Sequence, residues 1–298
     1  KNMKDIIVGI GEILWDVLPT GKVLGGAPAN FAYHISQLGF DGIAVSAIGN
    51  DELGEEIIEN LHRKNMNFII EKVSFPTGTV QVTLNDAGIP CYEICENVAW
   101  DNIPFTEEMK KLAQETKAVC FGSLAQRHPV SRQTIQQFLD IVPQEALKIF
   151  DVNLRQHFYS KELIDYSLKK CNILKINDEE ILLLSQLFDW NEKSDIDICK
   201  RLLRDYSLDM IVLTKGTNGS CVVTPHEISS KPTPIVEVAD TVGAGDAFTA
   251  GFVAGILKGK SVPDAHELAV EISAFVCTQQ GAMPTLPQEL INKISSPV

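Results

Sequence analysis

A short run of small residues followed by a carboxylate is the segment of the sequence best suited to chemistry. Gly243, Ala244 and Gly245 precede Asp246, and a small, apolar helix is predicted over residues 247–257. Residues this small leave backbone N–H groups uncovered at a helix start, where those groups and the helix dipole bind an anion. Asp246 alone would be an ordinary helix cap, but a cap does not require three small residues beside it. An anion site next to a carboxylate suits phosphoryl transfer, because the backbone holds the phosphoryl charge and the carboxylate accepts the proton of an attacking hydroxyl.

A second polar group stands at the end of a strand predicted over residues 148–152. Asp151, Asn153 and Arg155 occur at every second position there. Alternation would place the three side chains on one side, at the end where α/β proteins bind ligands. Arg155 can then neutralise phosphate charge. The alternative is an ordinary surface ion pair between Arg155 and Asp151.

The elements that must position these residues alternate along the chain. Apolar, β-branched runs predict buried strands, and helical patterns separate most of them. The predicted strands cover residues 6–10, 43–48, 119–122, 148–152, 173–176 and 211–214, and helices are predicted over 28–38 and 53–63. This alternation favours an α/β fold with a largely parallel central sheet and helices on both faces.

One region breaks the alternation. Residues 80–84 and 90–96 each alternate between apolar and polar side chains, and the turn at residues 85–88 joins them. This pattern predicts a hairpin with one polar face, and residues 15–24 add another short strand pair. These pieces form a small β-sheet outside the main layer. It is either a surface decoration or a lid over a cleft.

Composition narrows the class of partner. The chain of 298 residues has 26 basic and 39 acidic side chains, a net charge of −13, which disfavours nucleic acid and anionic membranes as partners. Seven cysteines without paired CxxC spacing predict reduced thiols and a cytoplasmic location. No apolar stretch approaches the ~20 residues of a membrane span, and the first residues lack the apolar block of a signal peptide.

Two long motifs resemble those of the ribokinase-like (PfkB) carbohydrate kinases. The segment 240–248 is similar to the second signature of that family, and the segment 25–32, Gly-Gly-Ala-Pro-Ala-Asn-Phe-Ala, to the first. They occur in the family's order and more than 200 residues apart. The amino-acid sequence of the first motif, residues 25–32, is most similar to that of the fructokinase subgroup. The resemblance implies a single three-layer, ribokinase-like domain over residues 1–298, with lid segments at about 15–24 and 78–98.

The resemblance also implies roles for individual residues. Asp246 would be the catalytic base, with Arg155 beside it. The N–H groups of residues 243–245 would form the anion hole, with Asp246 adding its own. The residues that would hold the sugar are Asp16, Gly25, Gly26, Asn30 and Asn153. Carboxylate and amide groups are suitable partners for sugar hydroxyls, and two glycines would let the ring approach the backbone. Without the resemblance, Asp16 is as well explained as a turn residue and Asn30 as a polar residue on a helix surface.

The same resemblance implies a nucleotide side and cation sites. Glu180, in the segment Asn177-Asp-Glu-Glu180, would organise Mg²⁺ through water, although carboxylates also belong in the first turn of a helix. The nucleotide-binding residues would be Asn177, Thr214, Lys215, Gly216 and Gly219, with adenine near residues 270–273. A monovalent cation such as K⁺ would lie near Asp240, Val242 and Gly281, mostly on backbone oxygens.

These observations predict an ATP-dependent sugar kinase, with fructose as the first-choice acceptor. Other acceptors of the class, ribose or 2-keto-3-deoxygluconate, are the alternatives, together with a non-catalytic sugar sensor. A dinucleotide-binding oxidoreductase is disfavoured because Leu14 stands where the fingerprint that begins at Gly9 requires a small residue. Some relatives pair their lids as dimers, but only eight residues separate Asp16 from Gly25, so the first lid hairpin is short and a homodimer is left open.

Overall fold

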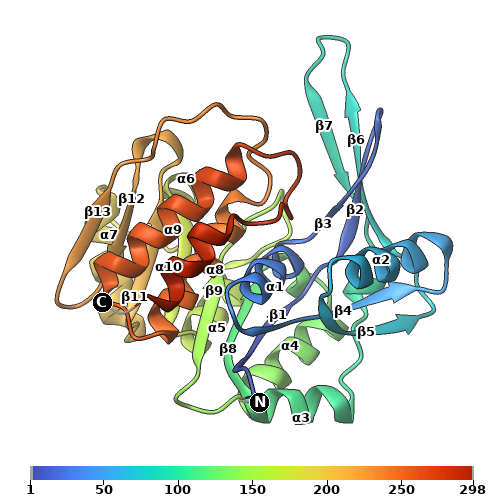
Figure 1. Ribbon diagram of the computed structural model, residues 1–298, viewed down its shortest axis with the longest axis horizontal. Coiled ribbons are helices and arrows are strands. Elements are labelled where there is room, and N and C mark those ends of the chain that lie inside the picture. The colour runs from blue at the N-terminus through green and yellow to red at the C-terminus, as the bar shows by residue number, and fades with distance from the viewer. Residues whose placement is uncertain (1–2, 297–298) are drawn as a thin grey trace.

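The main sheet of the computed structural model, which describes residues 3–296, has nine strands in the order β13-β12-β11-β10-β9-β8-β1-β4-β5 (Figure 1). Neighbouring strands from β5 through β11 run parallel, and β12 and β13 extend one edge in antiparallel fashion. The strands are β1 (Ile6–Ile10), β4 (Asp41–Gly49), β5 (Asn67–Val73), β8 (Thr116–Gly122), β9 (Leu147–Asp151), β10 (Ile173–Asn177), β11 (Met210–Thr214), β12 (Ser220–Val223) and β13 (Ile228–Lys231). The predicted α/β architecture is confirmed.

Helices cover both faces of this sheet. Helices α3 to α7 pack on one face through one apolar cluster, while α1 and α8 to α10 pack on the other through a second cluster (Figure 1). The helices are α1 (Ala27–Gln37), α2 (Glu52–Arg63), α3 (Glu107–Glu115), α4 (Pro129–Ile141), α5 (Lys161–Lys170), α6 (Asp178–Leu187), α7 (Asp195–Tyr206), α8 (Ala244–Leu257), α9 (Val262–Cys277) and α10 (Gln288–Ser295). Because both faces are covered, the parallel strands are apolar along nearly their whole length.

Side-chain caps fix where many of these helices begin. Asp51, Thr106, Ser160, Ser194 and Ser261 each accept a hydrogen bond from a backbone N–H in the first turn of the helix that follows. Helices α1 and α8 are different, since each begins at a glycine that has no side chain with which to cap. Their first N–H groups are therefore left for other partners.

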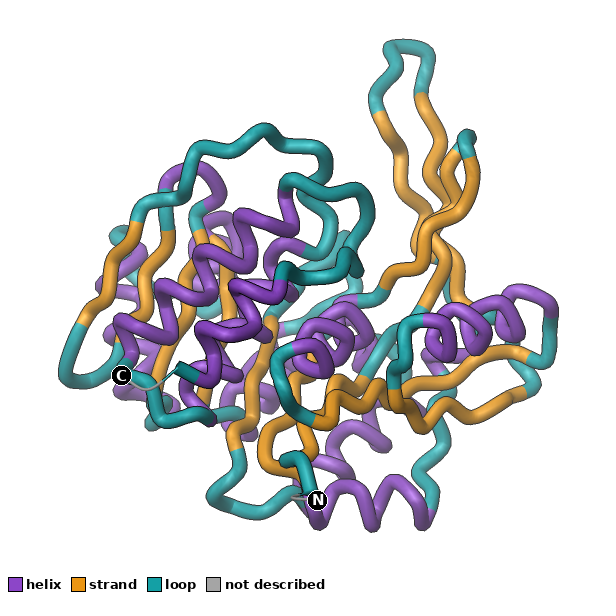
Figure 2. The backbone as a smooth tube through the Cα atoms, in the orientation of Figure 1, coloured by secondary structure: helices purple, strands orange, loops and turns teal. Residues whose placement is uncertain are grey.

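The two predicted lid segments pair with each other. Strands β2 (Leu14–Leu18), β3 (Gly21–Gly25), β6 (Gly78–Leu84) and β7 (Pro90–Ile94) form a second sheet in the order β3-β2-β6-β7, with β2 and β6 parallel. This sheet rises from the main body beside α1, as Figure 2 shows. The predicted alternation holds only at its base, where Val80 and Val82 are buried; Leu84, near the tip, is 59% exposed because the hairpin projects beyond the body there.

The base of the second sheet is anchored firmly. The Arg127 guanidinium donates to both carboxyl oxygens of Asp101, at 2.8 and 2.9 Å, and to the carbonyl of Cys95 at 2.7 Å. On the other side, the Trp15 indole donates to the carbonyl of Leu53 at 2.9 Å. These contacts fix the root of each lid segment to the main body.

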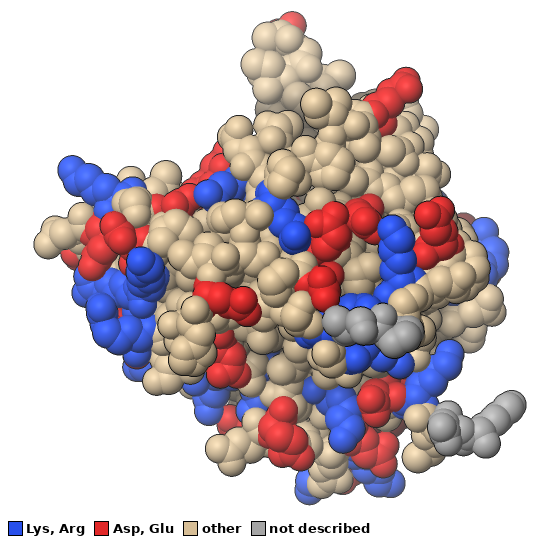
Figure 3. All heavy atoms as spheres, turned by 60° about the vertical axis from the view of Figure 1, so that its left-hand side comes forward, with Lys and Arg blue, Asp and Glu red and all other residues tan. Residues whose placement is uncertain are grey.

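The surface carries charge of both signs. On the face in Figure 3, basic side chains form separate groups among acidic ones rather than one continuous basic surface over the described residues. Within residues 3–296, no helix combines the length and the apolar character needed to cross a bilayer.

Candidate active site

A cavity of about 660 Å³ opens at the carboxyl ends of the parallel strands. From β1 the chain continues to β4 and β5 on one side and later to β8 and β9 on the other, so the order reverses at this point. Ligands of open α/β sheets bind at such a reversal. Residues at or after five strand ends line the cavity: Glu12, Leu124, Asp151, Asn177 and Thr214. The second sheet contributes the opposite wall.

The first turn of α8 forms the floor of this cavity. Gly243, the residue before the helix, has a φ of 77°, and a Cβ atom on it would lie 2.6 Å from that of Ala282. Only glycine fits there. Within the described chain, the N–H groups of Gly243, Gly245 and Asp246 donate to no protein acceptor. They are free to bind an anion.

Two details of α8 differ from the sequence prediction. The helix begins at Ala244 rather than at residue 247, because the small residues themselves form its first turn. The Ala244 N–H is not free, since it donates to the carbonyl of Thr241 at 3.3 Å and closes the turn into the helix. Of the N–H groups predicted to form the anion hole, those of Gly243, Gly245 and Asp246 are therefore free and that of Ala244 is not.

Asp246 stands in the first turn of α8 and points into the cavity. Its Oδ2 atom accepts a 3.0 Å hydrogen bond from Nδ2 of Asn30 on α1. Loss of solvation, followed by the negative charge of Asp151, raises the pKa of Asp246 to about 7. The bond from Asn30 and the charge of Lys175 act in the opposite direction. A carboxylate with such a pKa is well matched to general-base work near neutral pH.

The predicted sugar residues all line the same cavity, and the part that they line is called the sugar end below. Asn30 is buried, and its Oδ1 atom has no partner among the described residues. Asp16 lines the wall from β2, and its Oδ2 would be 2.8 Å from a Cβ atom on Gly25. Gly26 has a φ of 115°, and a Cβ on it would lie 2.4 Å from the carbonyl oxygen of Glu12. Backbone packing thus requires glycine at 26 independently of any ligand.

The loop after β9 brings Asp151, Asn153 and Arg155 to the same cavity, but not by strand alternation. The strand ends at Asp151, and Asn153 has a φ of 44°, so the chain turns instead of continuing extended. Arg155 is exposed at the rim, and its Nη1 atom donates to the carbonyl of Leu154 at 3.1 Å. The surface ion pair with Asp151 does not form among the described residues.

Glu180 holds this loop against the start of α6. Its Oε2 atom accepts from the N–H of Leu154 at 2.7 Å, and its Oε1 atom accepts from the N–H of Asn177 at 3.0 Å. Asn177 caps the same helix by accepting from the N–H of Glu180 at 2.8 Å. Burial raises the pKa of Glu180, with the charge of Asp151 adding to the effect. Both residues line the cavity.

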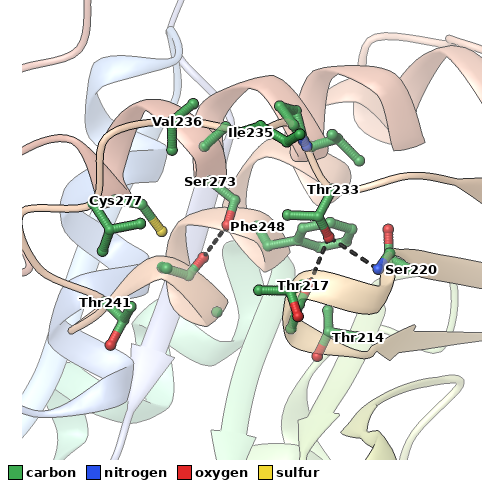
Figure 4. Close-up of a pocket in the computed structure, with 18 residues that line it drawn as sticks. Thr214, Thr217, Ser220, Thr233, Ile235, Val236, Thr241, Phe248, Ser273 and Cys277 are labelled. Atoms are coloured by element: carbon green, nitrogen blue, oxygen red, sulfur yellow. Dashed lines mark hydrogen bonds between the residues drawn. The ribbon is translucent and has the colours of Figure 1, made fainter.

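An apolar pocket of about 430 Å³ adjoins the cavity (Figure 4). Phe248, Val270 and Ser273 form one side, where the sequence predicts adenine. Thr214, Gly216 and Gly219 form the other side, with Thr214 lining both spaces. Thr233 fastens the turn by donating to the Gly216 carbonyl at 2.5 Å and accepting from the Gly219 N–H at 3.0 Å.

Lys215 does not line this pocket. Its Nζ atom lies 3.1 Å from a carboxyl oxygen of Asp195, at the start of α7, and the hydrogen bond raises the pKa of the lysine. The ion pair holds the side chain outside the lining of this pocket. The predicted role of Lys215 in nucleotide binding is therefore not supported, although its neighbours in the turn lie where expected.

Asp240 joins the segments in which a monovalent cation was predicted. Its Oδ1 atom accepts from the N–H of Val242 at 3.0 Å, and its Oδ2 atom accepts from the N–H of Gly281 at 3.1 Å. His34 of α1 is hydrogen-bonded to the carbonyl of the next residue, Ala282, at 2.9 Å. These bonds fix the turn that packs against Gly243.

Two charged residues of the cavity, Glu12 and Lys175, are not among the site residues predicted from the sequence. Glu12 follows β1 and is 3% exposed; burial raises its pKa to about 7, and its Oε2 atom has no partner among the described residues. Lys175 lies within β10 and is 5% exposed. The signal for Lys175 was present, because it interrupts the apolar run Ile-Leu-Lys-Ile, and lysine is seldom buried without a reason.

Comparisons with known proteins agree with this geometry. The sequence model of the family described as pfkB family carbohydrate kinase matches residues 14–289. A solved structure of an uncharacterized sugar kinase from Pyrococcus horikoshii in complex with ATP is 28% identical, with a TM-score of 0.81 over 97% of this chain and 99% of that one.

Two curated relatives match over similar lengths. An ATP-dependent 6-phosphofructokinase of Thermoanaerobacterium thermosaccharolyticum is 28% identical, covering 94% of this chain and 90% of its own. A fructokinase of Escherichia coli is also 28% identical, covering 94% of this chain and 96% of its own. The fold is the ribokinase-like fold that the motifs predict.

Proposed function

The chain belongs to the pfkB family of carbohydrate kinases, and we propose that it transfers the γ-phosphoryl group of ATP to a hydroxyl of a neutral sugar, with fructose as the first choice. The observation that carries this proposal is the position of Asp246. Its carboxylate stands between three free N–H groups on one side and Asn30 on the other. A hydroxyl held by Asn30 would therefore meet both a base and a phosphoryl group.

The charge of the sugar end favours a neutral acceptor. Glu12 and Asp16 both line this end, and the charge of the exposed Arg155 at the rim acts on both carboxyls. Burial raises the pKa of the Asp16 carboxyl, and the charge of Arg155 lowers it in part. Carboxylates accept hydrogen bonds from sugar hydroxyls, whereas they repel a sugar phosphate. Fructose is preferred because residues 25–30 are most similar to fructokinases and because curated relatives bear that name.

The proposed reaction is an in-line transfer. The acceptor hydroxyl gives its proton to Asp246 as its oxygen forms a bond to the γ-phosphorus atom. The bond from phosphorus to the bridging oxygen breaks, and ADP leaves with that electron pair. The N–H groups of Gly243, Gly245 and Asp246 stabilise the charge on the transferring group, which is the main contribution a protein makes to such a reaction.

The nucleotide and its Mg²⁺ fit the remaining space. The apolar pocket beside Phe248 and Val270 suits adenine, and it connects to the anion hole through Thr241 and Gly245. No three His, Cys, Asp or Glu side chains of residues 3–296 form a metal cage. Mg²⁺ held by ATP needs only one or two carboxylates and keeps its waters, and Asp151 and Glu180 supply such carboxylates. When bound, the ion would neutralise phosphate charge.

The second sheet would exclude water from the acceptor. It already touches the main body across the cavity, where Gln156 donates to the carbonyl of Tyr92 at 3.0 Å. Val80, Tyr92 and Ile94 place apolar surface over the sugar end. Water is a competing phosphoryl acceptor, so a lid of this kind protects ATP from hydrolysis.

An assay of ADP release with ATP and Mg²⁺ tests the proposal. The acceptors are fructose, ribose, 2-keto-3-deoxygluconate and fructose 6-phosphate, each measured with and without K⁺. We expect fructose to have the highest kcat/KM and fructose 6-phosphate the lowest, with K⁺ increasing the rate if the turn at Asp240 holds a cation. Preference for fructose 6-phosphate would overturn the neutral acceptor, and preference for another neutral sugar would replace fructose alone. Sugar binding without ADP release would indicate a sensor.

A further inference from the structure

Lys175 is a buried lysine within an apolar strand. Its side chain is 5% exposed, and its neighbours Leu174 and Ile176 are fully buried. Ile173, two residues earlier on β10, belongs to the apolar cluster formed with α8, so alternation directs Lys175 to the α8 side of the sheet. Burying an ammonium group is costly unless a counter-charge or a ligand compensates.

No such partner is present in the protein itself. Among the described residues, no carboxylate oxygen lies within 4.0 Å of the Lys175 Nζ atom, and the ammonium makes no hydrogen bond. Lys215, which directly follows the neighbouring strand β11, differs because it pairs with Asp195 at 3.1 Å. Buried lysines are rare without pairing, so the arrangement of Lys175 requires an explanation.

The Lys175 ammonium is directed at the start of α8. A Cβ atom built on Gly245 would lie 3.6 Å from Nζ, so the absence of a side chain at 245 leaves the ammonium open to the anion hole. The free N–H groups of Gly245 and Asp246 face the same space. A helix start and a buried, unpaired cation therefore converge on one position within the cavity.

We propose that Lys175 is a further catalytic residue, whose ammonium contacts the transferring phosphoryl group together with the N–H groups of Gly245 and Asp246. This inference rests on the proposed kinase function. In the transition state, charge is spread over the three equatorial phosphoryl oxygens and develops on the departing oxygen of ADP, so a fixed cation placed for this arrangement favours the transition state over bound ATP. Lys175 is the only cation of the described residues buried in the cavity, since Arg155 stands exposed at the rim.

A purely electrostatic role through Asp246 is the rival explanation. The charge of Lys175 lowers the pKa of Asp246, and the charges of Asp151 and Glu12 raise it. If this were the whole role, removing the ammonium would only shift the pH at which Asp246 ionises. Full activity would then return at high pH. Direct contact predicts a loss that persists when Asp246 is fully ionised.

The test compares Lys175→Met with Lys148→Met, which removes a half-buried lysine near the opposite end of the neighbouring strand β9. We expect Lys175→Met to lower kcat by about 10²–10³-fold, the usual effect of losing one transition-state donor. The loss should persist on the high-pH plateau, and KM for the sugar should change less than threefold. Lys148→Met should retain the wild-type kcat.

A binding measurement separates transition-state contact from a structural defect. ADP with Mg²⁺, aluminium fluoride and the sugar mimics the transferring group, and calorimetry measures its affinity beside that of ATP. Lys175→Met should weaken the aluminium fluoride complex at least tenfold more than it weakens ATP. Recovery of kcat at high pH, or equal weakening of both ligands, would overturn the inference. If Lys175→Met does not fold, Lys175→Gln is used in its place for the same kinetic and binding measurements.

The wild-type protein keeps the two proposals distinguishable. If the wild type releases ADP with a sugar and Lys175→Met is as active as the wild type, the kinase function is supported and the proposed role of Lys175 is contradicted. If the wild type neither releases ADP nor binds the aluminium fluoride complex, the proposed function itself is contradicted.

Discussion

The side chains of Asn30 and Asp246 are joined by a 3.0 Å hydrogen bond, although the two residues lie 216 positions apart in the sequence. Asn30 lies in the first turn of α1, among the predicted sugar residues, and Asp246 lies in the first turn of α8, at the proposed anion hole. The bond places the amide that we propose for the acceptor in direct contact with the carboxylate that we propose for its proton. It also links the first motif of the family to the second.

Asp246→Asn should lower kcat by about 10²–10⁴-fold, because the amide cannot accept the hydroxyl proton. ATP and sugar should still bind, since the anion hole and Asn30 remain. Steady-state kinetics and calorimetry measure the two effects. Asp264→Asn is the matched control, because Asp264 is an exposed carboxylate in the first turn of α9. Near-normal turnover in Asp246→Asn would remove this residue from the role of base.

The pH dependence of kcat/KM should have an acid limb near pH 7, where free Asp246 ionises. Asn30→Leu should move that limb to higher pH, because its hydrogen bond favours the ionised carboxylate. Asn67→Leu breaks a similar bond, from Nδ2 to Asp41 at 2.6 Å, on the exposed surface. That control should leave the limb unchanged. A limb at the same pH in Asn30→Leu would contradict the assignment of the limb to Asp246.

Asp246→Asn should also stabilise the fold at pH 8. The carboxyl has a folded pKa of about 7 against an ordinary value of 3.8, so the native state binds more protons and loses stability as pH rises between these values. Removing the charge should increase the free energy of unfolding at pH 8 by about 1–3 kcal/mol, with little difference below pH 4. Thermal or urea unfolding at the two pH values measures this. Equal free energies of unfolding for the wild type and Asp246→Asn at pH 8 would contradict the raised pKa of Asp246.

Gly243→Ala and Gly259→Ala form a matched pair. Both glycines have a positive φ, of 77° and 81°, so alanine should cost about 1–2 kcal/mol of stability at either position. At Gly243 a Cβ atom would also meet Ala282 at 2.6 Å, whereas at Gly259 nothing lies within 4 Å. Only Gly243→Ala should therefore lower kcat, by about 10²-fold through a displaced anion hole. Equal kcat values in the two variants would argue against a contribution of Gly243 to the anion hole.

Most of the main sheet could be predicted from local patterns, whereas β5, β12 and β13 were not predicted. The strands that match β1, β4 and β8 to β11 were recognisable as apolar runs, because burial on both faces removes polar residues from a parallel strand. The hairpin of β6 and β7 was recognisable because one face is polar at its base. The parallel pairing of β2 with β6 was not, since residues far apart in sequence leave no local signal of their contact.

The positions of site residues within a sequence motif could be predicted. The positions of residues that depend on tertiary packing could be predicted less well. The position of Asp246 after three small residues follows from sequence, but the engagement of the Ala244 N–H with Thr241 depends on turn geometry. Lys215 was assigned to the nucleotide from its turn, and the structure pairs it with Asp195 of a helix that sequence does not place beside it. Lys175 was overlooked because strand periodicity explains its neighbours and not its charge.

The most direct test of the central claim is to identify the product that receives the γ-phosphoryl group of ATP. ³¹P NMR of a mixture of the protein, ATP, Mg²⁺ and fructose resolves ADP, free phosphate and a phosphate monoester. The account predicts a monoester that appears in equal amount to ADP with the wild-type protein and is absent on the same timescale with Asp246→Asn. ADP accompanied only by free phosphate, or a monoester formed as fast by Asp246→Asn, would contradict it.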